Sequence, residues 1–296
     1  MIKKITFTLW SLYATTVALD STFYPAYGLD DDIIVHRSYA LSYSEPYEQA
    51  KWVIELLTRG HVLNDAFDRT DNFRADPAVM TGSAALADYS GSGYDRGHLA
   101  PAQDFAWDSV SMSESFFLSN MSPQNASFNR GIWAQFESQV RTWAIENDSL
   151  YVVTGPVLRS GLPTIGGNEV AVPEAYYKVL LVYTGNTQKG IGFVMANEGS
   201  NAGFETFDVA IDSVESLTGI DFFPVLPDGV EDAIEGGVNL SLWFEGVSPV
   251  KQRRERFKTR RQKRRTGCYD LRGRQVQVGH KVGAAPVWVD GLVRMP

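Results

Sequence analysis

A single stretch with helical spacing, set among short strand-like segments, is the feature that most constrains how this chain can fold. The apolar residues on one face of the predicted helix are Ile132, Trp133, Phe136, Val140, Trp143 and Ala144. Asn129 stands where an N-cap would be, and Asn147 stands where the helix would end. The strand-like segments around it do not alternate regularly with helices. This arrangement predicts an α+β fold with a mainly antiparallel central sheet and flanking helices.

The other elements follow from local patterns. Strands are expected over residues 33–43, 51–57, 115–119, 150–154, 176–183, 190–194 and 207–211. A short helix is expected to begin at Asp212 as its cap and to end near Gly219. Residues 62–94 are rich in Asp and Asn and predict a long surface loop.

The first residues have the pattern of an export signal. Lys3 and Lys4 precede an uncharged run that ends at Asp20. A bilayer span needs about 20 apolar residues, so this shorter run predicts a signal peptide over residues 1–19. A buried N-terminal strand is the alternative. The signal predicts a secreted, periplasmic or cell-surface protein without stable membrane association after export.

Charge divides the remainder of the chain near residue 250. Residues 1–250 hold 13 Lys and Arg against 32 Asp and Glu, a net charge of −19. Residues 251–296 hold 14 against 3, a net charge of +11. We therefore expect a folded domain over residues 20–250 and a basic tail over 251–296. The body is too acidic to bind nucleic acid through its overall charge, so such a function needs a local site.

Two interpretations of the basic tail stay open. The run Lys251–Arg265 is either a linker or a substrate-binding segment. The residues from Cys268 onward predict two short strands and resemble the end of a type IX secretion sorting tail. Cys268 is the single cysteine, so no intrachain disulfide can form.

One of the four histidines lies in a context that suggests catalysis. His98 ends the block Asp95–His98, which follows glycines at positions 91 and 93. Glycines allow sharp turns and close backbone approaches. Arg96 provides a planar donor group for phosphate, and an imidazole is the usual general base at neutral pH. With one cysteine in the chain, a clustered Cys/His zinc motif is excluded.

A second group of sequence segments makes the interpretation of the His98 segment more specific. The segments 119–124 and 129–133 follow His98, and Glu137 and Arg141 lie on the predicted helix. Together these blocks resemble the DNA/RNA non-specific endonuclease family, the ββα-metal nucleases. The resemblance runs from about Tyr47 to Pro227 and also includes the segments 73–74, 154–156 and 218–224.

The resemblance implies roles for the matching positions. His98 would activate the attacking water, and Asn129 would be the direct protein ligand of Mg²⁺, with Mn²⁺ as a substitute. Glu137 would bind the same metal through water. Without the resemblance, Asn129 would be interpreted first as an N-cap only, and Glu137 with Arg141 could be an ordinary helix pair.

Four further residues are expected to serve the substrate or the transition state. The resemblance assigns phosphate binding and charge stabilisation to Arg74, Arg96 and Arg141, and places Asn120 at the site edge, where it would position substrate or a loop. Arg74 could instead be a solvated loop residue.

The expected function is therefore a Mg²⁺-dependent hydrolase of DNA and RNA that leaves 5′-phosphate products. The alternative is a non-catalytic nucleic-acid-binding protein on the same scaffold. The resemblance also leaves a homodimer open.

Overall fold

The computed structural model describes residues 19–28, 31–185 and 187–244. The chain divides into two compact units, Met1–Val238 and Asn239–Pro296. The second unit is described only over residues 239–244, where Leu240–Leu242 forms a 3₁₀ turn. The expected signal peptide, apart from Leu19, and the basic tail lie outside the described residues. The domain boundary expected at residue 250 lies there too and stays a prediction.

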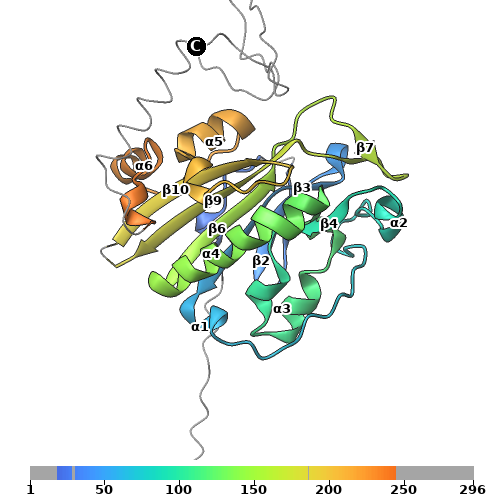
Figure 1. Ribbon diagram of the computed structural model, residues 1–296, viewed down its shortest axis with the longest axis horizontal. Coiled ribbons are helices and arrows are strands. Elements are labelled where there is room, and N and C mark those ends of the chain that lie inside the picture. The colour runs from blue at the N-terminus through green and yellow to red at the C-terminus, as the bar shows by residue number, and fades with distance from the viewer. Residues whose placement is uncertain (1–18, 29–30, 186, 245–296) are drawn as a thin grey trace, which may run out of the picture. The chain divides into compact units, whose positions relative to one another are not determined.

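A seven-stranded sheet forms the centre of the first unit, and Figure 1 shows its strands running across the molecule. In spatial order they are β1 (Asp32–Val35), β2 (Tyr39–Ser44), β3 (Gln49–Thr58), β6 (Ser149–Pro156), β9 (Ala175–Thr184), β10 (Thr187–Ala196) and β11 (Asp208–Val209). Every neighbouring pair is antiparallel, as the sequence predicts. One expectation was wrong: residues 33–43 form a hairpin of two strands, because the chain turns back over residues 36–38.

Side chains along each strand alternate between two faces of the sheet. On β9, Tyr177 and Val179 join a core cluster with residues of α5 (Ile211–Thr218) and α6 (Asp228–Glu235). Lys178, between them, points the other way, toward Trp133. We call these the α5/α6 face and the α4 face, after the helices that cover them.

Two glycines of β10 set the distance between the sheet and α5 and α6. A Cβ at Gly190 would lie 2.5 Å from Cγ2 of Ile234 and 2.7 Å from Cδ1 of Ile211. A Cβ at Gly192 would lie 2.7 Å from Cγ2 of Val214. Any larger residue would push both helices outward, so these glycines fix α5 and α6 firmly against the strand.

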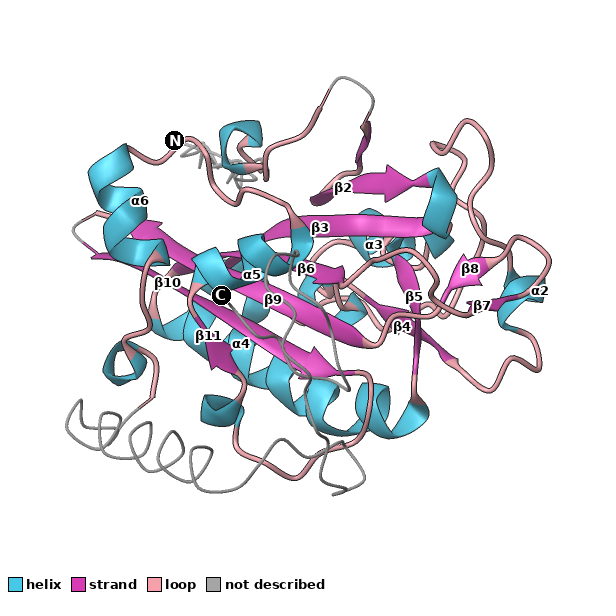
Figure 2. Cartoon of the chain, turned by 90° about the horizontal axis from the view of Figure 1, so that it is seen from above, coloured by secondary structure: helices cyan, strands magenta, loops and turns pink. Residues whose placement is uncertain are grey.

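Helix α4 (Ala134–Glu146) lies across the other face, packed through Phe136 and Trp143 on Phe193 of β10. The remaining helices are α1 (Arg59–Val62), α2 (Leu86–Tyr89) and α3 (Ser109–Glu114). Figure 2 shows α4 running beside the sheet. In the described part of the chain, no helix is long and apolar enough to cross a bilayer.

The start of α4 differs from the expectation. Asn129 is not its N-cap, because a π-helical turn over Phe128–Trp133 precedes the helix. Gly131 interrupts this turn with φ −106° and ψ −113°. Gly131 therefore marks a kink between two helical segments. The expected helix end at Asn147 is confirmed.

A second, two-stranded sheet precedes α4. Strand β4 (Asp95–His98) pairs antiparallel with β5 (Met121–Gln124), and the chain then enters α4. This is the ββα element, and Figure 1 shows β4 beside one end of α4. The strand expected over residues 115–119 was wrong, because Leu118–Asn120 forms a 3₁₀ turn and pairing begins at Met121. A third small sheet joins β7 (Thr164–Ile165) and β8 (Val170–Ala171).

Candidate active site

The side chain of His98 is nearly enclosed, with 8% of the residue exposed. Its ring packs beside Phe73 and Phe116, at centroid distances of 5.7 and 5.0 Å. Within the described part of the chain, its Nε2 atom has no hydrogen-bond partner. A neutral imidazole with one unpaired nitrogen retains a lone pair that can accept a proton.

Two guanidinium groups act on this histidine. Burial first, and then the positive charges of Arg69 and Arg96, lower the pKa of His98 to about 3. Arg69 lies over the ring of Phe116 and Arg96 over that of Phe73, with Cζ atoms 4.7 and 4.2 Å from the ring centroids. His98 is therefore neutral at neutral pH, which is the form that a general base requires.

The glycines of this segment serve two purposes. Gly91 and Gly93 have φ of 70° and 85°, which places them in the left-handed region and explains the turn before β4. Gly97 instead permits a close approach, because a Cβ there would lie 2.1 Å from Cδ of Gln124 on β5. Gly97 thus allows β4 to pack closely against Gln124 of its paired strand β5.

The amide of Asn129 is held in one orientation by Asp95. The Nδ2 atom of Asn129 donates to Oδ2 of Asp95 at 2.9 Å. Arg130 donates to both oxygens of the same carboxylate, at 2.8 and 2.5 Å. Burial raises the pKa of Asp95, but these hydrogen bonds outweigh burial and lower it, so the carboxylate stays ionised. With Nδ2 engaged, Oδ1 of Asn129 is the oxygen available to a metal ion.

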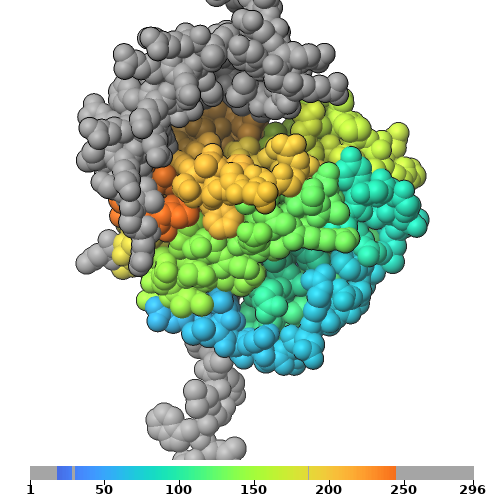
Figure 3. All heavy atoms as spheres, viewed as in Figure 1, coloured from blue at the N-terminus to red at the C-terminus, as the bar shows by residue number. Residues whose placement is uncertain are grey.

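Glu137 lies in the first turn of α4, close to the same arginine as His98. Burial raises the pKa of Glu137 to about 7, although Lys178 and Arg69 act in the opposite direction. Figure 3 shows the surface of α4 next to the loop that carries Arg69, with a recess between them. A carboxylate at this position of α4 suits the water-mediated metal contact that the resemblance implies.

A cluster of buried charged groups supports Glu137 on the α4 face. Arg141 donates to Oδ1 of Asp104 at 2.8 Å, and Lys178 donates to Oγ1 of Thr154 at 2.7 Å. Burial and the Asp104 carboxylate raise the pKa of Glu55 well above its usual range. Burial lowers the pKa of Lys178, and the carboxylates around it oppose that effect. Arg141 therefore holds the Asp104 carboxylate of this cluster in place.

Arg96 lies beside a surface cavity. Its side chain is exposed on β4. The cavity has a volume of about 520 Å³ and is lined by Leu86, Ala87, Tyr89, Ser90, Tyr94, Asp95 and Arg96.

Two of the expected substrate contacts are engaged elsewhere. The amide of Asn120 is fully buried; its Oδ1 accepts from the nitrogen of Ala100, and its Nδ2 donates to the carbonyls of Ala100 and Ser115. Asn120 thus braces the turn after His98, which corresponds to the loop-positioning alternative that the resemblance left open. Arg74 donates to the carbonyl and hydroxyl oxygens of Ser113 and lies over Phe117.

Sequence reasoning missed two residues of this site. Arg69, not Arg74, is the loop arginine whose charge acts on both His98 and Glu137. Asp95 belongs to the motif, but its role in orienting Asn129 depends on a contact across 34 residues. A sequence signal for Arg69 is absent, because the loop from residue 62 to 85 has no periodicity that would place its side chains.

Comparisons with known proteins agree with this geometry. The family model for DNA/RNA non-specific endonucleases matches residues 21–229. "Nuclease C1" of Cunninghamella echinulata var. echinulata is 37% identical over 218 residues, covering 67% of this chain and 85% of that protein. Human mitochondrial endonuclease G is 35% identical over 205 residues, covering 64% and 68%. The chain spans little more than half, 57%, of mitochondrial nuclease EXOG of Xenopus laevis.

A solved structure extends the agreement to the fold. It is titled as the crystal structure of the EndoG/EndoGI complex and its mechanism of EndoG inhibition. The match has a TM-score of 0.63 and 34% identity, and it covers 68% of this chain and 89% of that one. The ββα element, the antiparallel sheet and the matched residues together show that this chain belongs to the DNA/RNA non-specific endonuclease family, a family of phosphodiester hydrolases.

Proposed function

We propose that this protein is a Mg²⁺-dependent endonuclease that cleaves DNA and RNA without sequence preference and leaves 5′-phosphate ends. The observation that carries the proposal is the buried, unpaired Nε2 of neutral His98, flanked by Arg69 and Arg96.

The residues around Asn129 fit a hard metal ion. Oδ1 of Asn129 is left available by the contact with Asp95, and the Glu137 carboxylate lies in the first turn of α4. Mg²⁺ prefers oxygen ligands and keeps several waters, which suits one amide oxygen and one carboxylate acting through water. Bound there, the ion would neutralise the phosphate and assist the leaving oxygen.

The side chains of this chain would then divide the reaction between them. His98 removes the proton from the attacking water through Nε2. Arg96 and Arg69 stabilise the charge that develops on the phosphate oxygens, because both guanidinium groups act on His98 and Arg96 borders the cavity. Asp95 keeps Asn129 from rotating.

The test is degradation of plasmid DNA and of a structured RNA with Mg²⁺, with and without EDTA. We expect both substrates to be degraded and EDTA to abolish the activity. Labelling of the product ends should detect 5′-phosphate. Tight binding without cleavage would instead support a nucleic-acid-binding protein on the same scaffold, and 3′-phosphate ends would contradict the proposed geometry.

We further propose that the chain is exported, on the strength of the N-terminal pattern in residues 1–19. The measurement is N-terminal sequencing of the protein recovered from the medium or the cell surface. A protein that keeps Met1 and stays inside the cell would overturn this proposal.

A further inference from the structure

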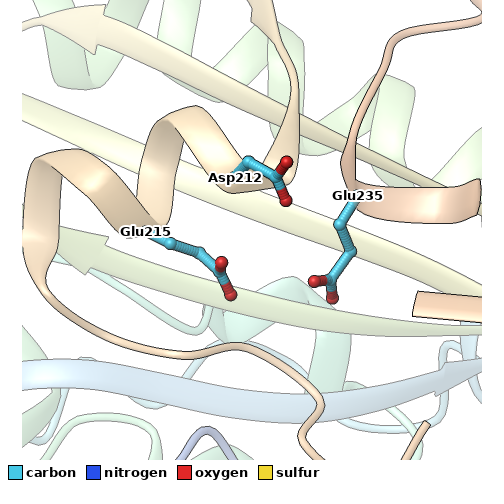
Figure 4. Close-up of side chains that lie close together, drawn as sticks. All are labelled: Asp212, Glu215 and Glu235. Atoms are coloured by element: carbon cyan, nitrogen blue, oxygen red, sulfur yellow. The ribbon is translucent and has the colours of Figure 1, made fainter. Parts of the chain in front are cut away.

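Three carboxylates gather on the α5/α6 face, on the opposite side of the sheet from His98. Asp212 and Glu215 lie one turn apart on α5, and Glu235 is the last residue of α6. One oxygen from each lies within 4.8 Å of the others. Figure 4 shows the three side chains converging on one another from the two helices.

One member of this cluster is buried without a partner. Glu235 is only 2% exposed, and its Oε1 atom has no hydrogen-bond partner in the described part of the chain. An unpaired carboxylate oxygen removed from water costs free energy, and two neighbouring carboxylates add repulsion. Such an arrangement is stable only when something compensates the charge.

The described part of the chain offers no compensating cation. None of its salt bridges involves Asp212, Glu215 or Glu235. The other charged neighbours that act on Glu235, Glu231 and Asp221, are acidic as well. Burial first, and then these carboxylates, raise the pKa of Glu235 to about 8.

The cluster is also held rigidly. The backbone nitrogen of Phe222 donates to Oε1 of Glu215 at 2.7 Å, which fixes that carboxylate. Gly190 and Gly192 allow α5 and α6 to pack closely on β10 through Ile211, Val214 and Ile234. The helix backbones that carry the three carboxylates are therefore fixed relative to one another.

We propose that Asp212, Glu215 and Glu235 bind a Ca²⁺ ion that joins α5 to α6. Ligand atoms within 4.8 Å of one another are close enough to share a single ion. Ca²⁺ takes about six to eight oxygen ligands in flexible geometry, so it accepts several carboxylates at once. Mg²⁺ is usually held by one or two carboxylates and keeps several waters, so a group of three carboxylates suits Ca²⁺ better. Water completes the shell on the side of exposed Asp212.

This ion is separate from the one expected at Asn129 and has a different consequence. It would stabilise the α5–α6 layer and leave the chemistry at His98 unaltered. The two sites differ in selectivity, because one offers an amide oxygen and a single carboxylate, whereas the other offers three carboxylates.

The test uses the full-length protein freed of metal by chelation and dialysis. Thermal unfolding is measured with increasing Ca²⁺ and, separately, with Mg²⁺. At a Ca²⁺ concentration about 100 times Kd we expect the wild-type Tm to rise by about 5–10 °C. Calorimetric titration should show a Ca²⁺ site that persists in Asn129→Ala.

Matched variants locate the effect. Glu235→Gln and, as a second variant at an exposed position, Asp212→Asn should lose this Ca²⁺ site and its Tm shift. Glu231→Gln removes the same charge from the same helix and should keep both. All three should retain the wild-type kcat/KM for DNA with Mg²⁺, which separates this site from the catalytic one. An equal Ca²⁺ shift in wild type and Glu235→Gln, or loss of Ca²⁺ binding only in Asn129→Ala, would overturn the proposal.

Discussion

The two faces of the central sheet both bury carboxylates, but they compensate the negative charge differently. On the α4 face, Glu55, Asp104 and Glu137 lie among Lys178 and Arg141. On the α5/α6 face, Glu235 lies among acidic groups, with no salt bridge in the described residues. Buried carboxylates that lie beside Lys or Arg side chains have their negative charge compensated within the folded chain. Buried carboxylates without such neighbours must be protonated or bind a metal ion.

The largest effect should come from His98→Ala. We expect kcat for DNA cleavage to fall by about 10²–10⁴, because the general base is lost. The fold should persist, since Nε2 of His98 makes no hydrogen bond in the described part of the chain. Steady-state kinetics with Mg²⁺ measures kcat, and circular dichroism measures whether the fold persists. If Glu235→Gln lowers kcat as much as His98→Ala does, the two faces of the sheet do not have separate roles.

Two asparagines near the site should behave in opposite ways. Asn129→Ala should remove most of the activity with little loss of stability, because its amide makes one partly buried hydrogen bond to Asp95. Asn120→Ala should lower the free energy of unfolding by about 2–4 kcal/mol, because it leaves buried backbone groups of Ala100 and Ser115 unpaired. Urea unfolding and activity assays on both variants measure this. If the folded fraction of Asn129→Ala keeps full activity with Mg²⁺, Asn129 is not a metal ligand.

The buried ammonium group of Lys178 should be essential to the stability of the α4 face. Lys178→Met should lower the free energy of unfolding by about 3–5 kcal/mol, because buried carboxylates lose their compensating charge. Arg159→Met is the matched control. Its ion pair with Glu174 is largely exposed and is worth about 0–1 kcal/mol. Equal losses in the two variants would show that Lys178 is not the compensating group.

The smallest effect should be a pH dependence on the α5/α6 face in metal-free protein. The pKa of Glu235 is raised from 4.5 to about 8, so the folded state binds its proton more tightly than the unfolded state does. Its contribution is therefore fully present below about pH 4.5 and is lost as pH rises through about 8. Asp212 and Glu215 on α5, Glu231 on α6 and Asp221 between them all favour this protonated form.

We expect Glu235→Gln to remove on the order of 2 kcal/mol of this pH-dependent stability. Saturating Ca²⁺ should flatten the profile of the wild-type protein, because the ion replaces the proton. The measurement is the free energy of unfolding between pH 5 and 9, with chelator and with Ca²⁺. Identical pH profiles for wild type and Glu235→Gln would remove Glu235 from this role.

Much of the site was predictable because its motif is local. Arg96 and His98 lie two residues apart on strand β4, so their side chains are expected on the same face of that strand. The strands 51–57, 150–154, 176–183 and 190–194 were predicted correctly, because their apolar runs are continuous. The helix over 134–146 was predicted from its one-sided spacing, which is again a property of nearby residues.

The features that the sequence did not predict share a physical cause, because they depend on partners distant in the chain. The first expected strand became a hairpin, because the backbone of β2 pairs with both β1 and β3. The intramolecular partners of Arg141 and Arg74 were not predictable either, because Asp104 and Ser113 lie more than 35 residues away in sequence. Spacing along the chain carries no information about which acceptor a long side chain will reach.

The sequence by itself thus determined the family and the fold class, and it nominated His98 and Asn129 as site residues, because these depend on residue type and short spacing. Only the tertiary structure decided which oxygen of Asn129 is available, which arginine acts on His98, and that Asp212, Glu215 and Glu235 converge. Burial is the physical reason. It raises or lowers a pKa and leaves an oxygen unpaired only when distant segments close around it.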